Sequence, residues 1–253
     1  MWVLGELIHN SHVISELEKL GIKTVEKLPC GENGVCIIRS HGASPEIMEE
    51  VSKMGYEIVD LTCPDVKKVQ QCAVELVKED YLLIIVGKPE HPEVVAINAN
   101  AKKFGDNVYI IPDISSLKEI EDKIKEHKKT GVVVQTTQRI EVLTEILNYL
   151  VRISKELKVY NTICASTRMR QEEAKDLAKV SDLMVVVGSK KSANTTHLAE
   201  ILREITKTIH IETDEELDEY SEIIKNSENI AITAGASTPD DIIKKVYNKL
   251  SQF

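Results

Sequence analysis

Six short segments rich in Ser, Thr, His, Gly and Asn follow stretches that the sequence predicts as β-strands. They span residues 40–45, 62–65, 87–93, 135–137, 188–194 and 233–240. In an open α/β sheet such loops share the edge at the carboxyl ends of the strands, where ligands bind. Helix starts there leave backbone N–H groups without partners and carry a partial positive charge, so several aimed at one cavity hold a multiply charged anion. The pattern predicts a small phosphorylated ligand.

The same residues also have an ordinary structural explanation. Proline directly follows Ser44, Cys63, His91 and Thr238, which is typical of the first helical position behind a capping residue. A Ser or Thr there can be a helix cap alone, and a Gly a turn residue alone. His41 and His91 can be ordinary hydrogen-bonded histidines. Six donor-rich loops in one chain favour a ligand site over a set of independent caps.

The cysteines are the second group that could do chemistry: Cys30, Cys36, Cys63, Cys72 and Cys164. Their odd number, their wide spacing and the lack of a CxxC pair disfavour a disulfide framework and leave core thiols, a reactive thiol or metal ligands. Cys72 has the helical spacing of a core residue and Cys36 lies within a predicted strand, whereas Cys30 lies in a loop. Cys63 and Cys164 each lie between a strand and a helix, where the local field favours thiolate, the form that binds metal. A ligand role and a buried or capping role both stay open for this pair.

Short apolar segments alternate with longer segments of helical period. The predicted strands cover residues 35–38, 56–61, 82–86, 107–111, 131–134, 183–187 and 229–232, and the predicted helices cover 45–54, 64–78, a segment after Pro92, 115–128, 140–156, 194–205 and 240–250. Strands that are apolar throughout are typical of parallel sheets covered by helices on both faces. The predicted fold class is therefore α/β, built from repeated strand-helix units. The charged stretch 212–222 is expected to be an exposed helical surface.

Composition limits the classes of function. The chain has 253 residues, with 32 Lys and Arg, 41 Asp and Glu, and a formal net charge of −9. Nucleic-acid binding and anionic-membrane binding both need clustered cations, which this balance disfavours. The longest apolar runs, at 81–86 and 183–187, are far shorter than a bilayer span, and no leading segment is typical of a signal peptide. We expect a cytoplasmic protein with neither a nucleic-acid nor a membrane partner.

A set of motifs in a fixed order resembles one enzyme family. The motifs are Leu7-Ile8-His9-Asn10, Ser40-His41-Gly42, Leu61-Thr62-Cys63-Pro64, His91-Pro92-Glu93-Val94, Gln135-Thr136-Thr137, Ile163-Cys164, Gly188-Ser189-Lys190 with Ser192 and Asn194, and Thr233-Ala234-Gly235-Ala236-Ser237. Their order, from about Leu4 to the C-terminus, is similar to that in 4-hydroxy-3-methylbut-2-enyl diphosphate reductase. That enzyme catalyses the last step of the methylerythritol phosphate route to isoprenoids.

The resemblance implies a fold of three small α/β lobes in pseudo-threefold arrangement around a central site. Carried onto this chain, it implies a first lobe at 1–62 that lacks its opening strand and helix, a second lobe at 63–162, a third lobe at 163–238 and a C-terminal helix at 239–253. It also implies a [4Fe-4S] cluster and an electron donor such as ferredoxin or flavodoxin. The substrate would be an allylic diphosphate, which loses its hydroxyl in a two-electron reduction that yields isopentenyl and dimethylallyl diphosphate.

The family's functional residues map onto named positions here. Cys63 and Cys164 would be cluster ligands. Glu93 would deliver protons, which needs reach and a suitable pKa, and Thr136 would help to place the substrate hydroxyl. The residues that would contact the diphosphate are His9, His41, His91, Ser192, Asn194 and Ser237.

This chain departs from the family pattern in three ways. The family's first cluster cysteine lies in an N-terminal Gly-Phe-Cys segment that has no match here, and we expect weak cluster binding and little turnover as a result. Val95-Ala96-Ile97 stands where Glu-Gly-Thr is usual, and Ala193 stands where the family has a second serine. Cys30 or Cys36 could substitute for the first cluster cysteine, but neither matches a family ligand, and Cys36 would need to leave its strand. The alternative is a non-catalytic degenerate homologue that keeps the diphosphate pocket.

Overall fold

The structure is a computed structural model, and it describes every residue except 6, 8–10 and 31–33. The chain forms two compact units. The first unit comprises residues 1–7 and 17–164, and the second comprises residues 8–16 and 165–253. In the part of the chain that the structure describes, no helix has the length and apolar character needed to cross a membrane.

The first sheet is parallel and has the strand order β2-β1-β3-β4. Its strands are β1 (Trp2–Leu4), β2 (Lys23–Val25), β3 (Val35–Ile38) and β4 (Glu57–Asp60), and its segment of the chain also holds helices α1 (Ser11–Lys19) and α2 (Pro45–Lys53). The side chain of Ser44 accepts a hydrogen bond from the backbone N–H of Ile47 and thereby caps α2, with Pro45 at the first helical position. Cys36 is fully buried in the core of this sheet.

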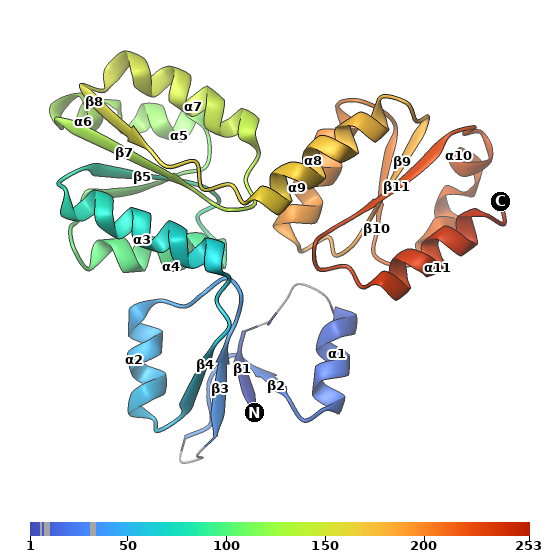
Figure 1. The fold of residues 1–253 in the computed structure, drawn as a ribbon, viewed down its shortest axis with the longest axis horizontal. Helices are drawn as coiled ribbons and strands as arrows, with labels where there is room; N and C mark the ends of the chain where they lie inside the picture. Colours follow the sequence, from blue (N-terminus) through green and yellow to red (C-terminus); the bar gives the residue numbers. More distant parts are fainter. Residues whose placement is uncertain (6, 8–10, 31–33) are drawn as a thin grey trace. The chain divides into compact units, whose positions relative to one another are not determined.

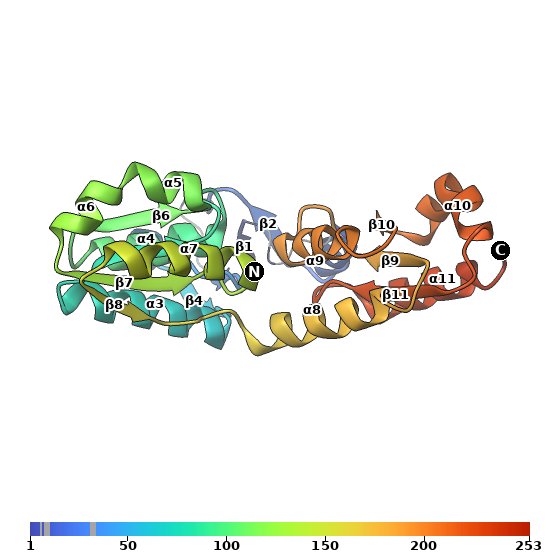
Figure 2. The same cartoon turned by 90° about the horizontal axis from the view of Figure 1, so that it is seen from above.

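The second sheet repeats that order as β6-β5-β7-β8, again in parallel. Its strands are β5 (Leu82–Val86), β6 (Val108–Ile111), β7 (Lys129–Val134) and β8 (Glu156–Val159). Helices α3 (Pro64–Lys78) and α4 (Pro92–Lys102) pack on one face, and α5 (Ile114–Glu119), α6 (Glu121–Glu126) and α7 (Ile140–Ile153) pack on the other (Figure 1). Figure 2 shows α5 and α6 beside β6. All five residues of β5 are buried because helices cover both faces.

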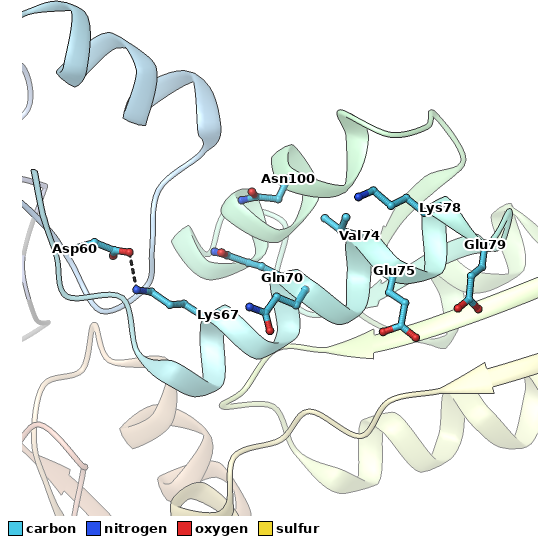
Figure 3. A pocket seen from close by; sticks show the side chains of 9 residues that line it. Asp60, Lys67, Gln70, Val74, Glu75, Lys78, Glu79 and Asn100 are labelled. Atoms are coloured by element: carbon cyan, nitrogen blue, oxygen red, sulfur yellow. Dashed lines mark ion pairs between the residues drawn. The ribbon is translucent and has the colours of Figure 1, made fainter.

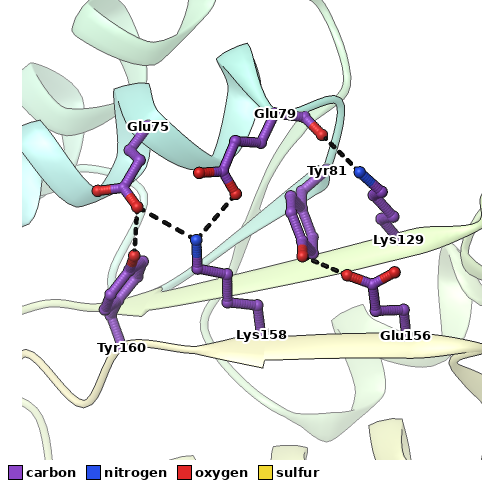
Figure 4. Close-up of polar contacts among 7 residues, drawn as sticks. All are labelled: Glu75, Glu79, Tyr81, Lys129, Glu156, Lys158 and Tyr160. Atoms are coloured by element: carbon purple, nitrogen blue, oxygen red, sulfur yellow. Dashed lines mark hydrogen bonds and ion pairs between the residues drawn. The ribbon is translucent and has the colours of Figure 1, made fainter.

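Polar contacts hold the edge strand β8 to α3 (Figure 4). The ammonium group of Lys158 lies 3.1 Å from Glu75 and 2.8 Å from Glu79, and the Tyr160 hydroxyl donates to Glu75 over 2.6 Å. The Tyr81 hydroxyl donates to Glu156 at the start of β8. These contacts fix the edge strand to the helix that packs on one face of the sheet.

The third sheet, in the second unit, has the order β10-β9-β11 and is also parallel. Its strands are β9 (Leu183–Val187), β10 (Thr208–Ile211) and β11 (Ile230–Ala234). Helices α8 (Ala165–Ala178) and α9 (Ala193–Arg203) pack on one face, and the 3-10 helix η1 (Asp214–Tyr220), α10 (Ser221–Lys225) and α11 (Asp240–Leu250) belong to the other. The predicted α/β class is confirmed.

Several elements differ from the sequence predictions. The predicted helix 115–128 is two helices, because Ile120 leaves the helical conformation between α5 and α6 with φ −110° and ψ 12°. The predicted helix 140–156 ends at Ile153, because Ser154 is extended and leads into β8. The short strands β1, β2 and β10 are not among the predicted strands, and β8 corresponds to the strand that was expected before Cys164 without stated bounds.

Candidate active site

A buried carboxyl group and a threonine form the centre of the candidate site. Glu93 lies in the first turn of α4, and Thr136 lies just after β7. The backbone N–H of Thr136 donates to Glu93 Oε1 over 2.6 Å, and its hydroxyl donates to Oε2 over 2.7 Å. Glu93 is 1% exposed. The two residues are brought together by the pairing of β5 with β7, because each follows the carboxyl end of one of these strands.

Burial changes the acidity of this carboxyl group. It raises the pKa of Glu93 to about 7, even though the two hydrogen bonds from Thr136 favour the charged form, and the nearby carboxylate of Asp65 contributes to the rise. A carboxyl group with a pKa near 7 is about half protonated at neutral pH, so it can both supply and take up a proton there. This is the behaviour expected of a general acid.

Two histidines lie beside this pair. His91 caps α4, and its Nδ1 accepts a hydrogen bond of 3.2 Å from the backbone N–H of Glu93. The ring of His41, from the loop after β3, meets the ring of His91 edge to face, with the centroids 5.3 Å apart. A hollow of about 340 Å³ is lined by the neighbours of both histidines, Gly42 and Pro92. His9 lies outside the described residues.

Two of the five cysteines lie in the same region. Cys63 precedes α3, and its backbone N–H donates to Ser40, one residue before His41. Cys164 directly precedes α8, and its backbone N–H donates to the carbonyl oxygen of Thr136 over 3.0 Å. Both are half-buried. Thr136 therefore contacts Glu93 through its hydroxyl and its backbone N–H, and Cys164 through its carbonyl oxygen.

The other cysteines have different surroundings. Cys36 and Cys72 are buried in two separate cores, and burial raises the pKa of both thiols. Cys30 is exposed. Among the described residues, no group of three or more His, Cys, Asp or Glu side chains is arranged to hold a metal ion. The described residues thus place two thiols at strand-helix junctions. Two thiols do not make a complete ligand set for a [4Fe-4S] cluster.

The remaining predicted residues lie in the second unit, in the loops after β9 and β11. Ser192 precedes α9, Asn194 lies in its first turn, and Ser237 follows β11. The side-chain nitrogen of Asn194 is buried and has no hydrogen-bond partner among the described residues. A buried donor without a partner is costly, and a bound anion would satisfy it. Gly188 has φ +142°, and a side chain there would collide with the hydroxyl of Thr238.

The β9–α9 loop has an anchor that the predicted site residues do not include. The ammonium group of Lys190 lies 2.6 Å from Glu216 of η1, and the backbone N–H of Lys190 donates to Glu212 over 2.6 Å. Burial alone would raise the pKa of Glu216, but the bonds from Lys190 and from two backbone N–H groups outweigh it and lower that pKa. The prediction that 212–222 is only an exposed surface was therefore wrong for Glu216. The signal available was the capping box formed with Thr213.

Another hollow lies away from these residues. It has a volume of about 740 Å³ and runs along α3, where Lys67 pairs with Asp60 at 2.6 Å (Figure 3). Within the described part of the chain, its lining includes none of the predicted site residues. A buried carboxyl group with a perturbed pKa is stronger evidence for chemistry than the volume of an open groove.

Comparison with known proteins gives the family. The family model described as LytB protein matches residues 1–251. The chain belongs to the LytB protein family.

Curated relatives of this LytB chain carry one name, 4-hydroxy-3-methylbut-2-enyl diphosphate reductase. The protein from Alkaliphilus oremlandii is 39% identical, and the alignment covers 100% of this chain and 88% of the relative. The protein from Geobacter sp. strain M21 is 42% identical, and the alignment covers 99% of this chain and 86% of the relative. The protein from Aquifex aeolicus is 37% identical, and the alignment covers 100% of this chain and 86% of the relative.

Two solved structures also resemble this LytB chain. One is a structure of (E)-4-hydroxy-3-methyl-but-2-enyl diphosphate reductase, with a TM-score of 0.70, 37% identity and coverage of 100% of this chain and 88% of that one. The other is the E-1-hydroxy-2-methyl-but-2-enyl-4-diphosphate reductase from Plasmodium falciparum, with a TM-score of 0.88, 29% identity and coverage of 98% and 77%. Both the family and the fold expected from the sequence motifs are confirmed.

Proposed function

We propose that this chain is a 4-hydroxy-3-methylbut-2-enyl diphosphate reductase of isoprenoid biosynthesis. It removes the hydroxyl group of the allylic diphosphate as water, with uptake of two electrons and two protons, and yields isopentenyl and dimethylallyl diphosphate. The names of the relatives support the substrate and the reaction. The observation that carries the proposal is the buried Glu93 carboxyl group, bonded to Thr136 and linked through Thr136 to Cys164.

Glu93 is the proton donor in this proposal. Its pKa of about 7 keeps a large share of the carboxyl groups protonated at neutral pH, and its burial keeps bulk water away from the proton. Loss of a hydroxyl group as water needs a proton on the departing oxygen, which a neutral carboxyl group supplies. The Thr136 hydroxyl lies 2.7 Å from Glu93 Oε2 and can exchange hydrogen bonds with the substrate hydroxyl.

The predicted diphosphate contacts that the structure describes all carry donors suited to phosphate oxygens. His41 and His91 in the first unit can donate through imidazole nitrogens, and the amide of Asn194 and the hydroxyls of Ser192 and Ser237 can donate in the second. The buried, unsatisfied nitrogen of Asn194 supports this role, because phosphate oxygens are acceptors only. His9 lies outside the described residues, so its proposed contact with the diphosphate rests only on its match to the family motif.

We extend the proposal to a [4Fe-4S] cluster with Cys63 and Cys164 among its ligands. The placement of both thiols at strand-helix junctions supports it, but two thiols do not complete the usual set of ligands. When bound, the cluster would supply the electrons, taken from a carrier such as ferredoxin or flavodoxin. Glu93 delivers the proton in this proposal, and the donors named in the preceding paragraph bind the diphosphate.

Anaerobic reconstitution with iron and sulfide tests this function. We expect substoichiometric iron and slow consumption of the allylic diphosphate with a chemical reductant. Cys63→Ser and Cys164→Ser should each lower the bound iron, whereas Cys30→Ser, at an exposed position, should not. The Aquifex aeolicus relative serves as the positive control. The proposal fails if the relative turns over and this chain neither binds nor consumes the substrate.

A further inference from the structure

The loops after β9 and β11 leave the third sheet side by side, because these two strands are neighbours (Figure 1). Their last paired residues are Val187 and Ala234, and the N–H of Gly235 donates to the carbonyl oxygen of Val187 over 2.9 Å. Gly188 and Gly235 are therefore the first residues of two adjacent loops, the β9–α9 loop at 188–192 and the β11–α11 loop at 235–239. The first loop leads to Asn194, and the second contains Ser237.

The side chain of Thr195 fills the space beside both glycines. Thr195 lies in the first turn of α9 and is fully buried. A Cβ atom on Gly235 would collide with the Thr195 hydroxyl oxygen, and a Cβ atom on Gly188 would lie 3.2 Å from its methyl carbon. One side chain of α9 therefore lies against the main chain of both loops.

A second threonine ties the β11–α11 loop to β9. The Thr238 hydroxyl donates to the carbonyl oxygen of Val187 over 2.9 Å, and the Thr238 N–H donates to the carbonyl oxygen of Gly235 over 3.0 Å. These bonds close a turn that contains Ser237. Because the turn is held on β9, its contact with Thr195 fixes how close α9 can approach it.

The Thr195 hydroxyl group is not what holds this side chain in place. Its oxygen is buried and has no hydrogen-bond partner within the described part of the chain. A buried hydroxyl without a partner costs free energy, and valine has nearly the same shape without that cost. The contribution of Thr195 to the two loops therefore comes from its shape.

We propose that Thr195 is a positioning residue, a spacer whose shape sets the separation of the β9–α9 and β11–α11 loops. The inference rests on the proposed function, in which Asn194 and Ser237 on these loops bind the diphosphate. A smaller side chain at residue 195 would let the loops shift, so that their donors are no longer held at one spacing. Donors that are already in place bind an anion more tightly, because less ordering is needed on binding.

Binding of inorganic diphosphate to the full chain, measured by isothermal titration calorimetry together with Tm, separates shape from polarity. Thr195→Val keeps the shape, so we expect a Kd within about twofold of the wild type and a higher Tm. Thr195→Ala loses the shape and should raise Kd by about three- to tenfold. Leu202→Ala leaves a cavity under the same helix and should lower Tm without raising Kd.

Two results of this series would overturn the proposal. If Thr195→Val weakens binding as much as Thr195→Ala, the hydroxyl and not the shape is required. If Leu202→Ala weakens binding as much as Thr195→Ala, general loss of stability explains the effect.

A double-variant cycle at Gly235 tests the contact without any ligand. Gly235→Ala places a methyl group on the Thr195 hydroxyl and should lower Tm. In the Thr195→Ala background the same change should lower Tm by about half as much or less, because the colliding oxygen is gone. A folded double variant beside an unfolded Gly235→Ala shows the same relief, and equal losses in both backgrounds contradict the spacer role. If the wild type does not bind diphosphate, the proposed anion site fails, whereas this cycle still decides whether Thr195 spaces the loops.

Discussion

The carboxyl group of Glu93 is the residue that most clearly combines structure with chemistry. Its side chain is 1% exposed, and its hydrogen-bond donors both belong to Thr136, 43 residues further along the chain. A buried carboxylate with two donors would normally have a low pKa, but burial is the larger effect here and raises the pKa to about 7. The fold therefore keeps an acid at neutral pH in a place that water does not reach freely.

This pKa makes stability depend on pH in a defined direction. Between about pH 4.5 and 7 the folded state keeps a proton on Glu93 that the unfolded state releases, so stability should fall as pH rises through that window. Glu93→Gln removes this titration. The unfolding free energy of the wild type relative to that of Glu93→Gln should therefore fall by on the order of 3 kcal/mol between about pH 4.5 and 7. Chemical denaturation at several pH values measures this. Glu90→Gln, at an exposed position in the same loop, should leave the pH dependence of the wild type in place.

At the scale of elements, the β9–α9 loop depends on residues that come later in the chain. Lys190 is bonded to Glu216 and Glu212, and the Nε2–H of the buried His210 donates to the carbonyl of Gly188 over 2.9 Å. Burial lowers the pKa of His210 despite this bond, which keeps the ring neutral. The loop that presents Ser192 and Asn194 is thus held by β10 and η1 as well as by its own strand and helix.

Release of this anchor should weaken anion binding by the loop. In Glu216→Gln the Lys190 ammonium loses its charged partner, and we expect the Kd for inorganic diphosphate to rise by about three- to tenfold, because the donors are less well positioned. Isothermal titration calorimetry measures it. Glu215→Gln changes a neighbouring exposed acid of η1 and should have no effect. Tighter binding in Glu216→Gln would mean that the freed lysine contacts the anion, contrary to a positioning role for Glu216.

At the scale of the whole molecule, each unit has its own interior. The second sheet is covered by two core clusters, one of which includes Leu76, fully buried against Gly131 of β7. The third sheet has two further clusters built from residues of the second unit. A destabilising substitution in one core should therefore first increase local unfolding of the sheet that this core supports.

Leu76→Ala tests this independence. The cavity should cost about 2 to 5 kcal/mol, because Leu76 is removed from a closely packed interior. We expect amide exchange to accelerate in β5 and β7 and to change little in β9, as measured by hydrogen exchange with mass spectrometry. Leu20→Ala, at a position 76% exposed, should have little effect. Equal acceleration in β9 would show that the two units open as one.

Much of the fold was predictable because its signals are local. The apolar runs of β5 and β9 and the prolines after Ser44 and His91 predicted buried strands and helix starts, which the structure confirms. The short strand β10 was missed, and the bounds of β8 were not predicted. β8 is a partly polar edge strand, and α3 stabilises it through contacts that join Lys158 to residues 79 and 83 positions away. No local pattern carries that information.

The sequence by itself determined the α/β class, the family motifs and the identity of the candidate donors and thiols, because each depends on residue type and on neighbours within a few positions. The tertiary structure decided which of them meet. Parallel pairing of β5 with β7 places Thr136 in hydrogen-bond contact with Glu93. The burial of Glu93 there raises its pKa, which no sequence pattern reports. The tertiary structure also showed that Glu216 holds the β9–α9 loop, since this contact joins η1 to a loop at the end of a neighbouring strand.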